Sequence, residues 1–218
     1  MIQLAEKHLI KKSNKYFKEV DKLAFESKNL YNFANYIIRQ EFITNKVYLN
    51  YNKIQKQLQS HETYKSLPAK VSQQILKLLD KNWLSFFKAI KDYSKNPSKY
   101  KGRPKLPKYK DKIKGRNILV YTTQAISKKE LKKGFIKLSG TDIKIKSDKK
   151  SIQQVRIIPR NKEYVVEIIY EQKEVELEVN KNDFISIDIG LNNLATITSN
   201  KKGLNPVIIN GRMLKSMN

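Results

Sequence analysis

One carboxylate in the C-terminal part of the chain stands where it could hold a metal ion. Asp188 ends the apolar run 184–187 and is followed closely by Gly190. A short apolar run with β-branched residues is typical of a strand that is buried on both faces. Because an ionised carboxylate is costly in such a strand unless it is paired, Asp188 is a candidate ligand of a divalent cation. Acids with this role hold two metals against a phosphate in phosphodiesterases.

The same residues allow a plainer interpretation, because a single Asp before a Gly at a strand end is often a turn former or a cap. Local chemistry leaves both interpretations open. After the turn 190–193, a second strand is predicted at 194–198 and a third at 206–210. A helix is expected to begin at about 211.

Residues 186–196 read Ser-Ile-Asp-Ile-Gly-Leu-Asn-Asn-Leu-Ala-Thr. This stretch resembles the first RuvC motif of the TnpB (OrfB) proteins of bacterial insertion sequences. Asp188 falls on that family's first catalytic acid, and Asn192 stands where Lys is common. The resemblance implies a transposon-encoded, RNA-guided DNA endonuclease involved in transposition and DNA recombination. It also implies that Asp188 is a catalytic and Mg²⁺-binding residue, with a guide RNA from the transposon end and target DNA as partners.

The resemblance covers only about the N-terminal half of a full-length family member. The family's later RuvC acids lie well downstream of the first, and its four-cysteine zinc insertion has no counterpart in a chain without Cys. We therefore expect a truncated member that binds no zinc, has an incomplete magnesium site and does not cleave DNA alone. Two alternatives stay open, namely a nuclease-dead remnant acting as a repressor and a generic basic RNA-binding protein.

Composition indicates the class of partner. Lys and Arg number 45 against 20 Asp and Glu in 218 residues, a formal charge of +25. Such a surface attracts polyanions, above all nucleic acid. A membrane surface is the other polyanion, but no basic amphipathic helix stands apart from the core pattern. Without Cys, a long apolar run or a secretory N-terminus, the chain is expected to be cytoplasmic and nucleoid-associated.

The N-terminal half is predicted to contain one strand followed by two long helices. Residues 2–10 could form a first strand, and 4-3 spacing of apolar residues predicts a helix over 14–43 with Ser13 as its N-cap. A shorter amphipathic piece is predicted at 51–59. Ser66 and Pro68 mark the start of the second long helix. Its aromatic residues Trp83 and Phe86 are interpreted as core rather than as base-stacking platforms.

A basic segment follows at 95–116. It has ten Lys or Arg, one acid, three Pro and two Gly, so it cannot fold alone and its prolines favour an extended path. Two interleaved tyrosines could stack on bases; a solvated linker is the alternative. Residues 67–76, 83–91 and 101–110 resemble the helix-to-basic-loop passage of TnpB proteins. The candidate nucleic-acid contacts, with two arginines from a later strand, are Lys95, Lys99, Tyr100, Lys101, Arg103, Lys105, Lys108, Tyr109, Lys110, Lys112, Lys114, Arg116, Arg156 and Arg160.

Beyond 117 the periodicity drops to two, which predicts strands at 118–126, 134–138, 141–146, 152–158, 163–170 and 175–179. The predicted fold class is α+β. It combines a small antiparallel barrel with an inserted helical lobe and then the first strands of an RNase-H-like (RuvC) sheet. In the resembled family the barrel is the wedge domain. The expected parts are 1–12 (first barrel strand), 13–94 (helical recognition lobe), 95–116 (basic segment), 117–180 (remaining barrel strands) and 181–218 (start of the RuvC-like domain).

Overall fold

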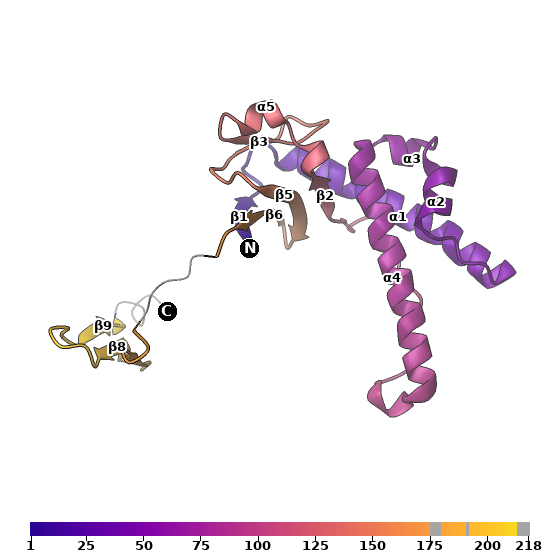
Figure 1. Cartoon of the computed structure of the whole chain (residues 1–218). Helices are drawn as coiled ribbons and strands as arrows, with labels where there is room; N and C mark the ends of the chain where they lie inside the picture. The colour runs from indigo at the N-terminus through magenta and orange to yellow at the C-terminus, as the bar shows by residue number, and fades with distance from the viewer. Residues whose placement is uncertain (175–179, 191, 213–218) are drawn as a thin grey trace. The chain divides into compact units, whose positions relative to one another are not determined.

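The computed structural model of the chain describes residues 1–174, 180–190 and 192–212. The chain divides into two compact units, Met1–Lys173 and Glu174–Asn218. The first unit contains a sheet and a set of helices, and the second contains three strands (Figure 1). The fold is thus mixed α+β with antiparallel sheets.

A four-stranded antiparallel sheet forms the centre of the first unit, in the order β1-β6-β5-β2. Its strands are β1 (Ile2–Ile10), β2 (Leu119–Thr122), β5 (Ile152–Arg160) and β6 (Glu163–Gln172). The first strand pairs with β6 along its whole length, so the predicted strand at 2–10 is confirmed. Alternate residues of β5, such as Val155 and Ile157, are fully buried, as in a half-buried strand. In the central strand β6, neighbours such as Ile168 and Ile169 are both buried.

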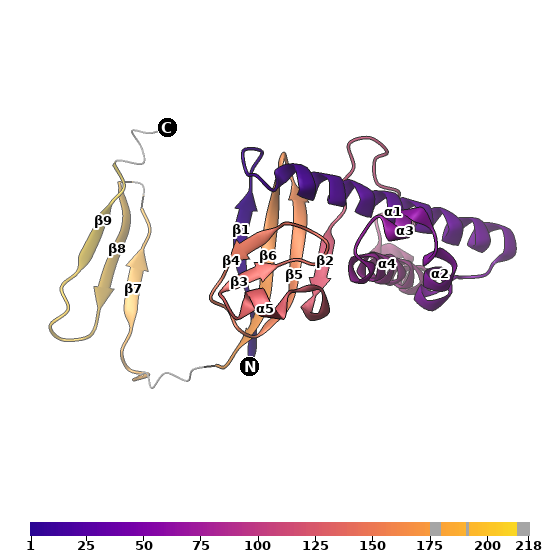
Figure 2. The same cartoon turned by 90° about the horizontal axis from the view of Figure 1, so that it is seen from above.

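The predicted barrel is not found in the described residues. The strands β3 (Phe135–Lys137) and β4 (Lys144–Lys146) pair only with each other, and β1 and β2 remain the two edges of an open sheet. The predicted strand at 141–146 is shortened because Thr141 forms a turn: its hydroxyl donates to Leu138 O and accepts from Ile143 N. The short hairpin and helix α5 (Lys128–Leu131) lie over one face of the sheet (Figures 1 and 2).

Four helices lie between β1 and β2 in the chain: α1 (Phe17–Asn45), α2 (Tyr51–Leu58), α3 (Glu62–Lys65) and α4 (Ala69–Lys95). The two predicted long helices are confirmed, and α4 crosses α1 beside the sheet (Figures 1 and 2). Ser13 is not the N-cap of α1, which is Tyr16. The side chain of Asn14 instead accepts from the backbone N–H of Tyr16 and shapes the turn before the helix.

An aromatic cluster holds α4 against α1. Trp83 is fully buried and makes edge-on contacts with Phe42 and Phe86, with ring centroids 5.4 and 6.0 Å away. Tyr48 and Phe87 complete the cluster. The prediction that Trp83 belongs to the core is therefore confirmed. Phe86 contacts the same cluster but stays half-buried.

The second unit contains the three predicted C-terminal strands, β7 (Ile185–Asp188), β8 (Asn193–Ser199) and β9 (Val207–Asn210). They form an antiparallel sheet in the order β7-β8-β9. The prediction that the first of them is buried on both faces is wrong for this structure, because Ile185 and Ile187 are 61% and 55% exposed. An apolar strand is buried only where another layer covers it.

Two predicted elements lie wholly or mostly outside the residues that the structure describes. The strand at 175–179 lies outside the described residues, as does most of the helix expected to begin at about 211. None of the helices in the described ranges combines the length and the apolar character that a membrane span requires.

Candidate nucleic-acid interface

The basic segment 95–116 leaves the far end of α4 through a short 3₁₀ turn, η1 (Pro97–Lys99) (Figure 1). From there to β2 it has no regular structure. A stretch without strand or helix must satisfy its backbone groups by other means. In the part that follows Leu106, polar side chains of α1 do so.

Two polar residues of α1 bind the backbone of the segment. Asn32 makes a pair of hydrogen bonds with Lys110: its amide donates to the carbonyl and its side-chain oxygen accepts from the N–H, both at 2.9 Å. One turn earlier, Lys28 Nζ donates to Lys112 O at 2.7 Å. Residues four apart lie on one face of a helix, so α1 presents a polar stripe along which the segment lies.

Lys28 is a buried cation, with only 2% of its surface exposed. Its ammonium group lies 3.7 Å from the centroid of the Phe25 ring. Burial, and after it the positive charge of Arg116, lowers the pKa of Lys28. A buried ammonium is normally costly, so this side chain acts as an anchor for the backbone at Lys112 rather than as a contact for an external anion.

A third anchor, Asn35, continues the stripe. Its amide donates to Pro107 O at 3.0 Å, and its side-chain oxygen accepts from the indole N–H of Trp83 at 3.0 Å. Asn35 has no exposed surface. It therefore ties the basic segment, α1 and α4 together at one point in the core.

Because the backbone of the segment is bound to α1, most of its charged side chains point to solvent. Lys110 and Arg116 are half-buried, and the other eight Lys and Arg are exposed. These eight are Lys95, Lys99, Lys101, Arg103, Lys105, Lys108, Lys112 and Lys114. Three of them, Lys108, Lys112 and Lys114, lie in the part of the segment that α1 anchors. Exposed cations held on an ordered backbone are the arrangement that binds a polyanionic backbone.

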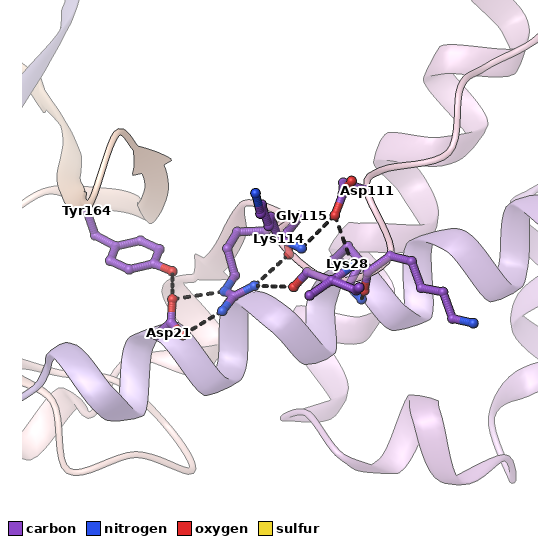
Figure 3. A network of polar contacts seen from close by, with 9 residues as sticks. Asp21, Lys28, Asp111, Lys114, Gly115 and Tyr164 are labelled. Carbon is purple, nitrogen blue, oxygen red and sulfur yellow. Dashed lines mark hydrogen bonds and ion pairs between the residues drawn. The ribbon is translucent and has the colours of Figure 1, made fainter.

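The end of the segment is fastened by an ion pair (Figure 3). Arg116 donates from Nε and Nη2 to the two carboxylate oxygens of Asp21 on α1, at 2.9 and 2.8 Å. The hydroxyl of Tyr164 on β6 donates to the same carboxylate at 2.6 Å. The hydrogen bonds from Arg116 hold the pKa of Asp21 below its usual value. Arg116 was predicted as a nucleic-acid contact, and the structure places its guanidinium against Asp21.

The one acid of the segment, Asp111, builds a tight loop (Figure 3). Its carboxylate accepts from the backbone N–H groups of Ile113 and Lys114, at 2.9 and 2.6 Å. The loop closes on Gly115: a Cβ there would overlap the carbonyl oxygen of Asp111 and lie 3.0 Å from its backbone nitrogen. Only glycine fits this approach without a backbone shift.

We expect Gly115→Ala to lower the free energy of unfolding by about 1–3 kcal/mol, because the methyl group is forced into a packed backbone. Urea denaturation followed by circular dichroism measures the change. Gly102→Ala is the matched control, since a Cβ at Gly102 meets nothing within 4 Å. Equal stability of Gly115→Ala and the wild type would contradict the loop geometry.

The two tyrosines of the segment differ in accessibility. The hydroxyl of Tyr100 donates to Asp92 at 2.7 Å, and its ring packs edge-on against Tyr93 at a centroid distance of 5.7 Å. Tyr109 is 43% exposed and carries the guanidinium of Arg39 over its ring at 4.8 Å. Of the two, Tyr109 is the better placed to stack on a base.

The two predicted arginines of β5 lie in different settings. Arg156 is half-buried in mid-strand and pairs in register with Glu167 of β6. Arg160 is exposed at the strand end, where it borders a hollow of about 440 Å³ together with Lys114, Arg116 and Lys162. The fold thus brings Arg160 next to the end of the basic segment. Sequence reasoning missed Lys162, which sits in the β5–β6 turn at φ +62°.

The candidate metal ligand Asp188 is the last residue of β7 and pairs in register with Thr196 of β8. Asp188 is exposed to solvent. Within the described ranges, no three or more His, Cys, Asp or Glu side chains gather in a way that could hold a metal ion. These residues therefore do not fit a two-metal site, which needs several converging carboxylates.

Comparisons with known proteins complete these observations. No protein-family model matches the chain, and no curated protein matches it. Among solved structures, the chain is similar to a Cas12f1–sgRNA–target DNA complex at 11% identity and a TM-score of 0.37, covering 99% of this chain and 59% of that one. A CRISPR-Cas12f ternary complex gives 10% identity and a TM-score of 0.36, covering 92% and 49%. The chain thus spans about half to three fifths of the length of these structures.

Proposed function

We propose that this chain is a nucleic-acid-binding part of a TnpB-like, transposon-encoded protein. The observation that carries the proposal is the basic segment, which exposes eight cations and whose backbone after Leu106 is bound to α1. A preordered row of cations binds phosphates with little loss of conformational entropy. A solvated linker, the alternative interpretation, has no need of three side-chain anchors, two of which, Lys28 and Asn35, are buried.

The finer assignment comes from the motifs. Residues 186–196 and 101–110 resemble TnpB passages, so the proposed partners are a guide RNA from the transposon end and target DNA. In that assignment the sheet β1-β6-β5-β2 is the wedge domain, α1–α4 are the recognition lobe and β7–β9 begin the RuvC-like domain. Base pairing would read the target, while the protein grips the heteroduplex by its backbone.

To test the assignment, the chain is purified from a host that carries the proposed transposon, and the bound RNA is sequenced. We expect transcripts of the transposon end to be enriched. In binding assays at matched salt, affinity for such a transcript should exceed the affinity for random RNA of equal length. Equal affinities would favour a generic basic RNA-binding protein.

The role of Asp188 is tested separately. Because the described residues do not group carboxylates around it, we expect residues 1–218 to bind guide RNA and target DNA without cutting. Asp188→Asn should leave the affinity for nucleic acid unchanged, since the basic segment supplies the binding. Titration of labelled RNA and a Mg²⁺-supplemented cleavage assay with both proteins check this. Specific cutting by the wild type that Asp188→Asn abolishes would contradict the proposal of binding alone.

A further inference from the structure

A second feature of the interface is a hollow of about 750 Å³ between α1, α4 and the basic segment. Its floor contains Phe42 and Phe86 from the two helices, together with Ile90 of α4 and Leu106 of the segment. Pockets of this size that combine apolar and aromatic side chains with positioned polar groups are typical binding sites for small organic groups.

The rim of the hollow is cationic. Arg39 of α1 and Arg103, Lys105 and Lys108 of the segment line it, and no acid is among its lining residues. Tyr109 also lines the rim, with Arg39 stacked over its ring at 4.8 Å. The hollow therefore joins an aromatic, apolar floor to a set of unneutralised positive charges.

The half-buried state of Phe86 supports a function beyond packing. Trp83, one turn earlier on α4, is fully buried, and Phe86 touches it edge-on at 6.0 Å. Phe86 is thus fixed in position by the core while part of its ring borders the hollow. An aromatic ring that is rigid and partly accessible is a suitable stacking partner, because little entropy is lost on binding.

We propose that this hollow holds one unpaired nucleotide of the bound nucleic acid. Its base lies against Phe86 and Tyr109, and its flanking phosphates contact Arg103, Lys105 and Lys108. The inference rests on the proposed nucleic-acid-binding function and adds a site for a base to it. A base inside a duplex is stacked on both sides and cannot enter such a hollow, so the occupant is a nucleotide of a single-stranded stretch.

Two labelled oligonucleotides separate base binding from phosphate binding: an oligouridylate and an oligomer of the same length with abasic sites throughout. Both carry the same charge. We expect the wild type to bind the oligouridylate about tenfold more tightly in fluorescence anisotropy, since stacking contributes about 1–3 kcal/mol per base. Phe86→Leu and Tyr109→Leu should reduce this preference to less than about threefold, because they keep apolar volume but remove the aromatic face.

The affinity of both variants for the abasic oligomer should equal that of the wild type. Tyr36→Leu is the matched control, since Tyr36 is a 53% exposed aromatic on α1 that does not line the hollow. It should keep the full preference. Thermal unfolding identifies any variant that has lost its fold, and Tyr109→Leu, at an exposed position, remains informative if Phe86→Leu is destabilised.

The outcomes distinguish the two proposals. If the wild type binds both oligomers equally well, the nucleotide site is wrong and the proposed nucleic-acid binding stands. If neither oligomer binds, the proposed function itself is wrong. A loss of preference in Tyr36→Leu equal to that in Tyr109→Leu would also overturn the assignment of the site to this hollow.

Discussion

Asn35→Leu is expected to lower the free energy of unfolding by about 2–4 kcal/mol, because it removes the partner of the buried Trp83 indole N–H and of the half-buried Pro107 carbonyl. Asn35 has no exposed surface. Its side chain accepts from the indole of Trp83 and donates to Pro107 O, both at 3.0 Å. Leucine has the same number and branching of side-chain heavy atoms, so the substitution removes the hydrogen bonds without leaving a cavity. Urea denaturation gives the change directly.

A matched control and a second background sharpen this experiment. Asn45→Leu changes an exposed Asn of α1 that bonds only within its helix, to Glu41, and should shift stability by no more than about 0.5 kcal/mol. In a Trp83→Phe background the indole donor is absent, so Asn35→Leu should cost less there than in the wild type. An equal cost in both backgrounds would show that the hydrogen bond to Trp83 is not the source of the effect.

Neutralising four exposed cations of the basic segment should have the largest effect on affinity. We expect the fourfold Lys→Gln variant at 101, 105, 108 and 112 to bind single-stranded RNA on the order of 100-fold more weakly at 0.1 M salt, with a salt slope smaller by about 3. With each phosphate contact that is lost, fewer counterions are released on binding, and the salt dependence of the affinity falls. Anisotropy titrations over a series of salt concentrations measure both quantities.

The control removes the same charge elsewhere in the first unit. Four exposed lysines in and beside α5 lie outside the segment: Lys128, Lys129, Lys132 and Lys133. Their replacement by Gln should weaken binding much less, because net charge acts over a distance that salt screens. A loss equal to that of the segment variant would show that binding depends on net charge alone and not on where the segment places its cations.

The regular elements of the first unit were largely predictable, because they follow from local periodicity. The strand at 2–10 and the start of α4 after Pro68 are found at or within a residue of their predicted positions. Apolar spacing also placed Trp83 in the core. These features depend on which side chains lie on one face of an element, and neighbours in the chain determine that.

The anchors of the basic segment were not predicted. Lys28, Asn32 and Asn35 are polar residues at helical spacing within an otherwise apolar stripe of α1, and that interruption was the available signal. Their partners lie 84, 78 and 72 residues later in the chain. No local pattern indicates that a backbone from so far away will lie along the helix.

Two expectations failed for a related reason. Apolar alternation after 117 predicted strands, which we expected to close into a barrel, but among the described residues β1 and β2 remain the edges of an open sheet. The apolar run before Asp188 predicted a buried strand, yet Ile185 and Ile187 are exposed. Apolarity shows which face favours burial, whereas burial itself depends on a second layer.

The sequence by itself therefore determined the charge, the two long helices, most of the strands and the basic segment with its possible partners. The tertiary structure alone decided that the part of this segment after Leu106 lies along α1, that Arg116 pairs with Asp21, and that Phe86 and Tyr109 border one cationic hollow. Local elements follow from contacts between near neighbours in the chain. A binding surface is made by residues far apart in sequence, and their approach is decided by the packing of the whole unit.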